Sequence, residues 1–364
     1  MDTAKNNLYK KLRDEAISLE RESDALAANG DNAGAMEKIQ RSLEISEELL
    51  GIVGQDDPVV LRDISLSLLR IGDMHQATGN TSRAKVEFER ALELSDKALV
   101  ILGDENPQLL RDVYVLLDRI GRIQLNDGDQ NAALQTFQRA RELSEKVLLI
   151  VGEDEPEALR EVSALFSKIG DILVLRGDTS GAKLNFQRAL DLSERSLRLE
   201  TDYPQEAHQY AAMSYYRMGN ILRQEGDFTG AIKNFRSYLE SQEAILGMRR
   251  ANRPHALQGV INALSCIGEV LVEMDDLKGA EQISKRALSL CQEVLTIVGE
   301  DEPVAQADWC LSASRVADIC IDKPLAARSM QRMEKIARQF PNDAYFESIF
   351  DYTKVVVSGL STLK

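Results

Sequence analysis

The segment that decides the fold runs from Leu68 to Pro107 and reads LLRIGDMHQATGNTSRAKVEFERALELSDKALVILGDENP. The segment from Leu117 to Pro156 reads LDRIGRIQLNDGDQNAALQTFQRARELSEKVLLIVGEDEP, and it aligns with the first without a gap after a shift of 49 residues. The pentapeptide GEDEP at 152–156 returns at 299–303, which is 147 residues or three such shifts later. Self-similarity at a fixed period of roughly 20–50 residues is typical of repeat architectures. The sequence therefore predicts an array of repeats.

The repeat extends over nearly the whole chain of 364 residues. Similar segments begin at Leu19, Phe166, Tyr215 and Leu264, and a shortened copy that has lost about three residues begins at Ser314. We therefore interpret residues 1–364 as a single array of about seven repeats with a C-terminal cap. The predicted repeats are about 12–60, 61–109, 110–158, 159–207, 208–256, 257–305 and a degenerate 306–341, and the cap is 342–364.

Each copy is predicted to fold as two antiparallel helices, so the fold class is all-α. Apolar residues recur at spacings of three and four, as at Leu68, Ile71 and Met74, which is the period of an amphipathic helix. In the turn TGNTS, a glycine can end the first helix and the next Asn or Asp can cap the second. In the GEDEP loop, the glycine can end a second helix, and Pro156 suits the first turn of the next helix.

The composition excludes some classes of partner. The formal net charge is -15, from 59 acidic and 44 basic residues. A chain with this balance is not expected to bind nucleic acid, since that affinity depends on neutralising phosphates, and it is not expected to bind an anionic membrane surface. The sequence shows no run like a signal peptide's apolar core and no uninterrupted apolar stretch that could span a bilayer. A cytoplasmic protein is therefore expected.

Motifs for catalysis or metal binding are not found in the sequence. The three histidines do not cluster with carboxylates, and no HExxH, nucleophile elbow or phosphate-binding loop is present. The four cysteines do not have zinc-site spacing and are interpreted as small buried residues. We therefore expect no enzyme activity, no cofactor and no metal site, and an enzyme is the least favoured function class.

Small and aromatic residues recur at fixed positions of the repeat. The pattern of a first-helix glycine, a turn glycine and A-x-x-x-F-x-x-A in the second helix resembles the tetratricopeptide repeat. Small side chains let two helix backbones approach, and the aromatic ring fills the gap beside them. The residues that match are the first-helix glycines Gly72, Gly121, Gly170, Gly219 and Gly268, the turn glycines Gly79, Gly128, Gly177 and Gly226, and the aromatic residues Phe88, Phe137, Phe186 and Phe235.

The repeats also depart from the family pattern. The period of 49 exceeds the usual period of about 34 residues, so the chain resembles a long-period variant with longer helices. In the sixth copy, Ser284 stands where four earlier copies have the aromatic residue. The resemblance implies a right-handed superhelical solenoid whose first helices line a concave face, where a peptide or protein partner binds.

Charged residues recur at the first-helix positions that the resemblance assigns to this concave face. One interpretation is that Arg70 pairs with Asp73, three residues on, as an ordinary surface pair. Lys168 and Asp171 would pair in the same way. The candidate partner-binding residues are Arg70, Asp73, Arg111, Arg119, Arg122, Arg160, Lys168, Asp171, Tyr216, Arg217, Asn220, Arg223 and Glu269.

The alternative interpretation is that the arginines of the third to fifth copies form a basic strip that no acidic residue neutralises. Arginine can bind carboxylates in a bidentate manner, so we hypothesise that the strip binds an acidic protein segment. The leading function class is then a non-catalytic interaction scaffold or adaptor. A regulator of an effector that responds to a peptide or ligand, of the bacterial signalling or defence type, is the other class kept open.

Two further segments are candidates for contacts with partners. In GMRRANRPH at 247–255, Arg249, Arg250 and Arg253 replace the acidic loop of other copies and could face an acidic partner or a second copy. The aromatic C-terminal tail is predicted to cover the open end of the array, which repeat proteins require. If the tail does not dock, it offers an apolar surface for self-association.

Overall fold

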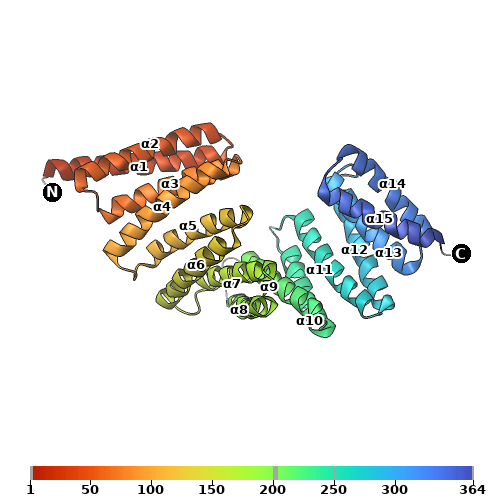
Figure 1. Ribbon diagram of the computed structural model, residues 1–364. Helices are drawn as coiled ribbons and strands as arrows, with labels where there is room; N and C mark the ends of the chain where they lie inside the picture. The colour runs from red at the N-terminus through yellow and green to blue at the C-terminus, as the bar shows by residue number, and fades with distance from the viewer. Residues whose placement is uncertain (1–2, 200–203, 250, 363–364) are drawn as a thin grey trace. The chain divides into compact units, whose positions relative to one another are not determined.

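The computed structural model describes residues 3–199, 204–249 and 251–362, and these residues form fifteen α-helices and no strand (Figure 1). The all-α fold class is thereby confirmed. The helices are α1 Thr3–Ala28, α2 Asn32–Val53, α3 Pro58–Ala77, α4 Thr81–Leu102, α5 Pro107–Asn126, α6 Gln130–Val151, α7 Pro156–Leu175, α8 Thr179–Arg198, α9 Pro204–Gln224, α10 Phe228–Gly247, α11 Arg253–Glu273, α12 Leu277–Val298, α13 Pro303–Cys320, α14 Lys323–Gln339 and α15 Ala344–Thr362.

The helix boundaries follow the predicted period. The second helices of the first six repeats begin at residues 32, 81, 130, 179, 228 and 277, so successive starts are 49 residues apart. The next second helix begins at Lys323, which is 46 residues after Leu277. The degenerate copy has therefore lost three residues, as predicted.

The turn chemistry also agrees with the sequence. The Asp129 side chain accepts a hydrogen bond from the Ala132 amide at the start of α6, and a positive φ of 117° at Gly152 ends that helix. At the start of α7, the Glu155 carboxylate accepts from the Ala158 amide beside Pro156. Each side chain satisfies an amide that has no partner inside its helix. The GEDEP loop is thus a boundary between helix pairs.

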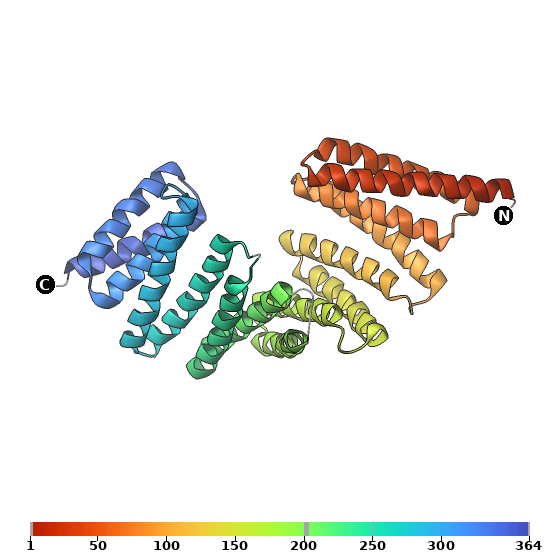
Figure 2. The ribbon, with the colours of Figure 1, turned by 180° about the vertical axis from the view of Figure 1, so that it is seen from behind.

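The chain divides into two compact units, Met1–Asn185 and Phe186–Lys364, and the boundary lies within α8. In unit 1, helices that follow one another from α1 to α7 pack side by side (Figure 2). In unit 2, the same holds from α9 to α15, and α15 also packs on α13. Each unit is therefore a stack of antiparallel helix pairs, and the superhelical course of the whole array stays a prediction.

The C-terminal helix α15 closes the end of unit 2. Phe346, Ile349 and Val356 of α15 are buried in one hydrophobic cluster with Trp309 of α13. The Arg332 guanidinium lies 4.3 Å from the centre of the Trp309 ring, which is within the range of a cation–π contact. The tail therefore docks as predicted. Self-association was predicted only for a tail that does not dock, so this reason for it does not apply.

One helix among the described residues, α11, is long and apolar enough to cross a membrane by length and composition alone. Half of its most apolar 18-residue window is buried within the fold, where α11 packs between α10 and α12. A buried core helix has the same composition as a membrane span, so the apolar character of α11 has a structural explanation.

Candidate functional site

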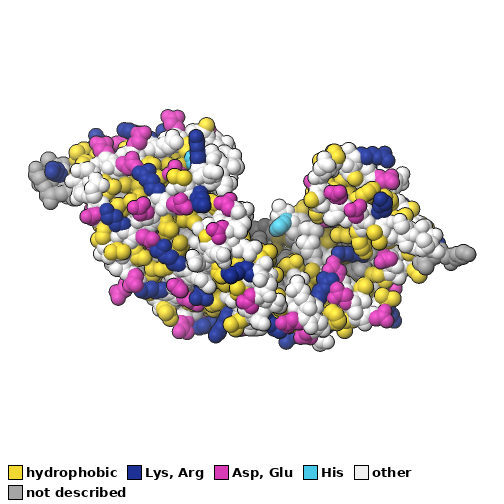
Figure 3. Space-filling view, viewed as in Figure 1, with side chains coloured by type: hydrophobic (Ala, Val, Ile, Leu, Met, Phe, Trp, Pro, Cys, Tyr) yellow, Lys and Arg dark blue, Asp and Glu magenta, His cyan; other side chains and the backbone are white. Residues whose placement is uncertain are grey.

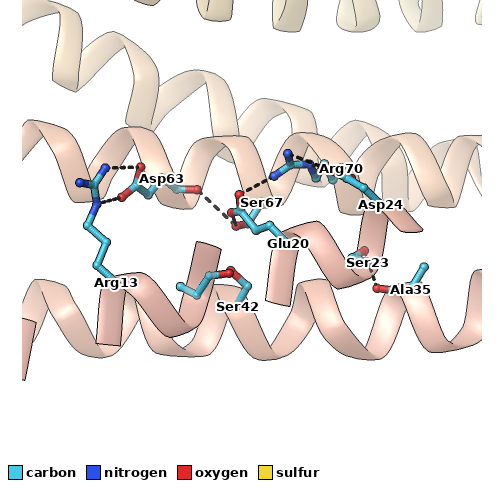
Figure 4. A network of polar contacts seen from close by, with 10 residues as sticks. Arg13, Glu20, Ser23, Asp24, Ala35, Ser42, Asp63, Ser67 and Arg70 are labelled. Atoms are coloured by element: carbon cyan, nitrogen blue, oxygen red, sulfur yellow. Dashed lines mark hydrogen bonds and ion pairs between the residues drawn. The ribbon is translucent and has the colours of Figure 1, made fainter. Parts of the chain in front are cut away.

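Charges of opposite sign alternate on the surface of each unit. Figure 3 shows Lys and Arg side chains interspersed with Asp and Glu on the visible face. The reason is that the first helices of neighbouring repeats exchange ion pairs. Arg70 Nη1 lies 2.7 Å from Glu20 Oε2, and Arg119 Nε lies 2.7 Å from Asp73 Oδ1 (Figure 4 shows the Arg70 contacts). The predicted pair of Arg70 with Asp73 is therefore wrong, because each side chain pairs instead with the first helix of a different neighbouring repeat.

The second column of charges pairs in the same way. Arg13 Nε lies 2.7 Å from Asp63 Oδ2, and Arg62 Nε lies 2.5 Å from Asp112 Oδ2. The partners are 50 residues apart, which is one repeat of 49 plus one. Further pairs are Arg111 with Glu161 and Lys168 with Asp118. We call these contacts between first helices the inter-repeat ladder.

The ladder removes most of the free charge from the predicted basic strip. Arg111 and Arg119 are each paired with a carboxylate of a neighbouring repeat, and Arg223 is paired with two. Asp171 and Arg217 are also engaged in polar or electrostatic interactions. Carboxylates of the protein itself thus neutralise these arginines, contrary to the hypothesis of a free basic strip.

The remaining strip residues have different environments. Arg122 is exposed on α5. Arg160 is buried on α7, and its Nη1 has no hydrogen-bond partner among the described residues. Asn220 lies half-buried on α9 beside Arg223, in a shallow hollow. In the 247–255 loop, Arg253 Nη2 lies 2.6 Å from Glu293 Oε1, and Arg250 lies outside the described residues.

The ladder makes a stability prediction. The Asp112 side chain is only 8% exposed, so Arg62→Ala leaves a buried carboxylate without its main partner and is expected to lower the free energy of unfolding by about 1–2 kcal/mol. In the control, Arg90→Ala, the pair with Glu47 joins two second helices and both side chains are more than 40% exposed, so a loss below about 1 kcal/mol is expected. Urea unfolding measures both, and equal losses would contradict this account of the ladder.

In three repeats, a first-helix glycine packs directly against the phenylalanine ring of the second helix. A Cβ atom added to Gly72 would lie 2.4 Å from a ring carbon of Phe88, and one added to Gly219 would lie 2.5 Å from Phe235. Gly121 faces Phe137 in the same way. Each ring is buried, so glycine is required at these positions because the ring occupies the space that a side chain would need.

The sixth repeat lacks this ring. A Cβ atom added to Gly268 would meet nothing closer than Ser284 Oγ at 3.5 Å. A pocket of about 430 Å³ opens at this place, with Gly268 and Ser284 in its wall. We call it the sixth-repeat pocket, and its apolar lining comprises Leu264, Val272, Leu277, Ala287, Ile319 and Ile321.

Charged side chains surround the mouth of the sixth-repeat pocket. Arg223 Nη1 lies 2.6 Å from Glu269 Oε2, and its Nη2 lies 2.5 Å from Glu273 Oε1. Arg315 also pairs with Glu269. The hydrogen bonds that Arg223 donates to Glu273 and Glu269 raise its pKa, so the guanidinium stays charged. Asp318 is exposed at the same mouth.

A second hollow of about 680 Å³ lies next to this pocket on the first helices of unit 2. We call it the first-helix groove, and its exposed lining includes Met213 and Tyr216 of α9 and Asn262 of α11. The Tyr216 ring lies 5.6 Å from that of Tyr238, so its position is fixed by packing. Among the described residues of the lining, Arg315 is the one Lys, Arg, Asp or Glu.

The thiols near these sites are poor nucleophiles. Burial raises the pKa of Cys266, which lines the groove, and of Cys291 to about 12, and it raises the pKa of Cys310 to about 11. They are therefore protonated at neutral pH, whereas the thiolate is the reactive form and the metal ligand. In the part of the chain that the structure describes, no three His, Cys, Asp or Glu residues are grouped to hold a metal ion.

Of the predicted site residues, Tyr216 lines the groove, and Arg223 and Glu269 line the sixth-repeat pocket. The groove residues Met213, Gln258 and Asn262 were not predicted, because a neutral side chain on an exposed helix face has no distinctive sequence pattern. The pocket did have a signal in the sequence, which is Ser284 at an otherwise aromatic position.

Comparison with known protein families identifies the type of repeat. A family model described as the tetratricopeptide repeat matches residues 66–97 and 212–245. The chain contains tetratricopeptide repeats. The two matches cover parts of α3 with α4 and of α9 with α10, which are tetratricopeptide helix pairs with an intact glycine–phenylalanine contact. No curated protein matches this tetratricopeptide-repeat chain in sequence.

Solved structures share the helical fold of this tetratricopeptide-repeat chain. The S. pombe nuclear import adaptor Nro1 superposes with a TM-score of 0.57 at 13% identity, over 83% of this chain and 98% of that one. BtubC from P. vanneervenii gives 0.51 at 17% identity, over 70% and 89%. A signal transduction ATPase with a tetratricopeptide repeat sensor from Pyrococcus horikoshii gives 0.52 at 11% identity, over 94% and 49%. At these identities the likeness establishes the fold.

Proposed function

We propose that the chain is a protein-interaction scaffold or adaptor that binds a peptide segment of its partner in the first-helix groove of unit 2. The observation that carries this proposal is the neutral groove itself. Elsewhere on the first helices, many charged side chains pair with one another in the inter-repeat ladder, whereas the groove presents mainly apolar and amide side chains to solvent.

The groove lining suits a polypeptide. Tyr216 and Met213 offer apolar contact area, and the amide side chains of Gln209, Gln258 and Asn262 can both donate to and accept from a peptide backbone. Gln258 Nε2 already donates to Asn262 Oδ1 at 3.1 Å, which fixes the orientation of both amides. A surface built on packed helices loses little conformational entropy when a segment docks.

The acidic-partner hypothesis receives less support. Arg111, Arg119 and Lys168 would have to give up carboxylates of the protein itself before they could bind those of a partner. Such an exchange of one ion pair for another gains little free energy at a solvent-exposed surface. We therefore propose a partner segment that is not acidic.

A random dodecapeptide library displayed on phage, selected against the full chain, tests the proposal. Asn262→Arg places a long cation in the groove, and it is expected to weaken enriched peptides about tenfold or more, which corresponds to about 1.4 kcal/mol. Gln282→Arg makes the same charge change on an exposed position of α12, outside the groove, and should leave binding unchanged. Equal affinity for both variants would remove the groove from the binding surface.

A further inference from the structure

The sixth-repeat pocket lies where other repeats have a phenylalanine side chain. In three other repeats, a buried phenylalanine ring occupies the space beside the first-helix glycine, and in the sixth repeat Ser284 leaves that space open. The pocket volume of about 430 Å³ is ample for a ring, since about 150 Å³ of apolar cavity is enough to bind benzene. The vacancy therefore has the size and chemistry that suit a six-membered ring.

Exposed apolar side chains lie among the charged ones at the mouth of the pocket. Val272, Leu277 and Ile321 are 46%, 49% and 58% exposed, and all three line the pocket. Ile321 also has a left-handed backbone, with φ 56° and ψ 38°, which is a strained conformation for a β-branched residue. The left-handed backbone ends α13, where the Ile321 amide donates to the Ala317 carbonyl, but this turn does not require an exposed apolar side chain, which a docked apolar group would cover.

The pocket and the first-helix groove adjoin each other. Ser265 and Arg315 line both of them, so one segment of chain can cross from the groove to the pocket mouth. A peptide in the groove therefore brings its side chains to the pocket at little further cost in translational and rotational entropy.

The charge at the mouth favours a basic neighbour. Two arginines and three carboxylates line the pocket, so carboxylates are in excess there, and both arginines already pair with Glu269 or Glu273. Exposed Asp318 is left to pair with a cation of a partner. The net charge of -15 for the whole chain adds long-range attraction for a basic segment.

From these observations we propose that the sixth-repeat pocket receives an aromatic side chain of the partner segment, with a lysine or arginine of the same segment beside Asp318. This inference rests on the proposed function and adds the anchor residue to it. A ring buried in a pocket at an interface is the kind of contact that carries a large share of binding energy.

Ser284→Phe tests the anchor, because it places in the sixth repeat the ring that the other repeats have. Dodecapeptides enriched from the displayed library are expected to contain an aromatic residue with a basic residue nearby. Fluorescence anisotropy should show about tenfold or greater weakening by Ser284→Phe, which corresponds to about 1.4 kcal/mol. The control Ser289→Phe adds the same ring to an exposed position of α12 and should bind as the unaltered chain does.

Ile321→Gly provides a second variant that does not depend on how a new ring packs. Glycine adopts the left-handed backbone without strain, so the unfolding midpoint should rise. The same variant removes part of the apolar mouth, so peptide affinity should fall. A gain in stability together with a loss of binding is not expected of a residue with a purely structural role.

The outcomes separate this inference from the proposed function. Peptides that bind Ser284→Phe and Ile321→Gly as tightly as the unaltered chain, but are weakened by Asn262→Arg, would overturn the anchor and leave the groove. Enriched peptides without an aromatic residue, or with acidic neighbours, would overturn the stated partner chemistry. If N-acetylphenylalanine amide alone binds as tightly as the peptides, the pocket is a small-molecule site and the anchor is overturned. A library that yields no binder would overturn both proposals.

Discussion

Phe88→Ala is expected to lower the free energy of unfolding by about 3–5 kcal/mol. The Phe88 ring is fully buried against Gly72, and the helices around it are held in place by their neighbours in the stack. Truncation removes the ring's apolar contacts and leaves a cavity that the stack cannot collapse to fill. Urea unfolding followed by far-ultraviolet circular dichroism measures the loss.

The matched control for Phe88→Ala is Ser284→Ala, at the equivalent position of the sixth repeat. Ser284 already borders an open pocket, so its truncation is expected to change stability by less than about 1 kcal/mol. A loss of several kcal/mol from Ser284→Ala would mean that Ser284 holds the sixth repeat together as Phe88 holds the second. The pocket would then be a structural feature and not a vacancy.

Adding a methyl group on the opposite side of the same contact is expected to have opposite effects in two repeats. Gly72→Ala forces the new Cβ against the buried Phe88 ring at 2.4 Å and should destabilise the chain by about 1–3 kcal/mol. Gly268→Ala places its Cβ 3.5 Å from Ser284 Oγ and 3.7 Å from Ile283 Cγ2, which are ordinary contact distances. Because alanine favours a helix over glycine, Gly268→Ala should be neutral or stabilise by up to about 1 kcal/mol.

Thermal and urea unfolding of both glycine variants measure these changes in stability. The sign of the difference is the informative quantity, since both substitutions are chemically identical and both lie in first helices at the same repeat position. If Gly268→Ala destabilises the chain as much as Gly72→Ala, the space beside Gly268 is not open to a side chain, and the sixth-repeat pocket cannot accept one.

The fold could be predicted from the sequence because its determinants are local. Asp129 at an N-cap, Gly152 with a positive φ and Pro156 at a first helical turn each act within a few residues of their own position. The 49-residue spacing then sets where such signals recur, and the structure confirms it from α2 to α12. Even the three-residue loss before α14 could be read from the degenerate copy.

The site could be predicted only in part, because its determinants act between repeats. Arg70 and Asp73 are near neighbours in one helix, yet each pairs with a different adjacent repeat. Whether a charged side chain pairs within its helix or between repeats depends on the distance between the stacked first helices. Ser284 was visible as a departure from the pattern, but whether other side chains would fill the space depends on tertiary packing. Ile321 stands at the turn position that Gly226 and Asp275 occupy in earlier copies, so its left-handed backbone follows the repeat, whereas the exposure of its side chain beside the pocket depends on tertiary packing.

Photo-crosslinking tests the central claim most directly. The aromatic residue of an enriched peptide is replaced by p-benzoylphenylalanine, the complex is irradiated, and the attachment site is mapped by mass spectrometry. The account predicts attachment to the pocket lining in α11, the start of α12 and the end of α13, within residues 264–277 and 312–321. Attachment confined to unit 1, or to the outward face of the second helices, would contradict it.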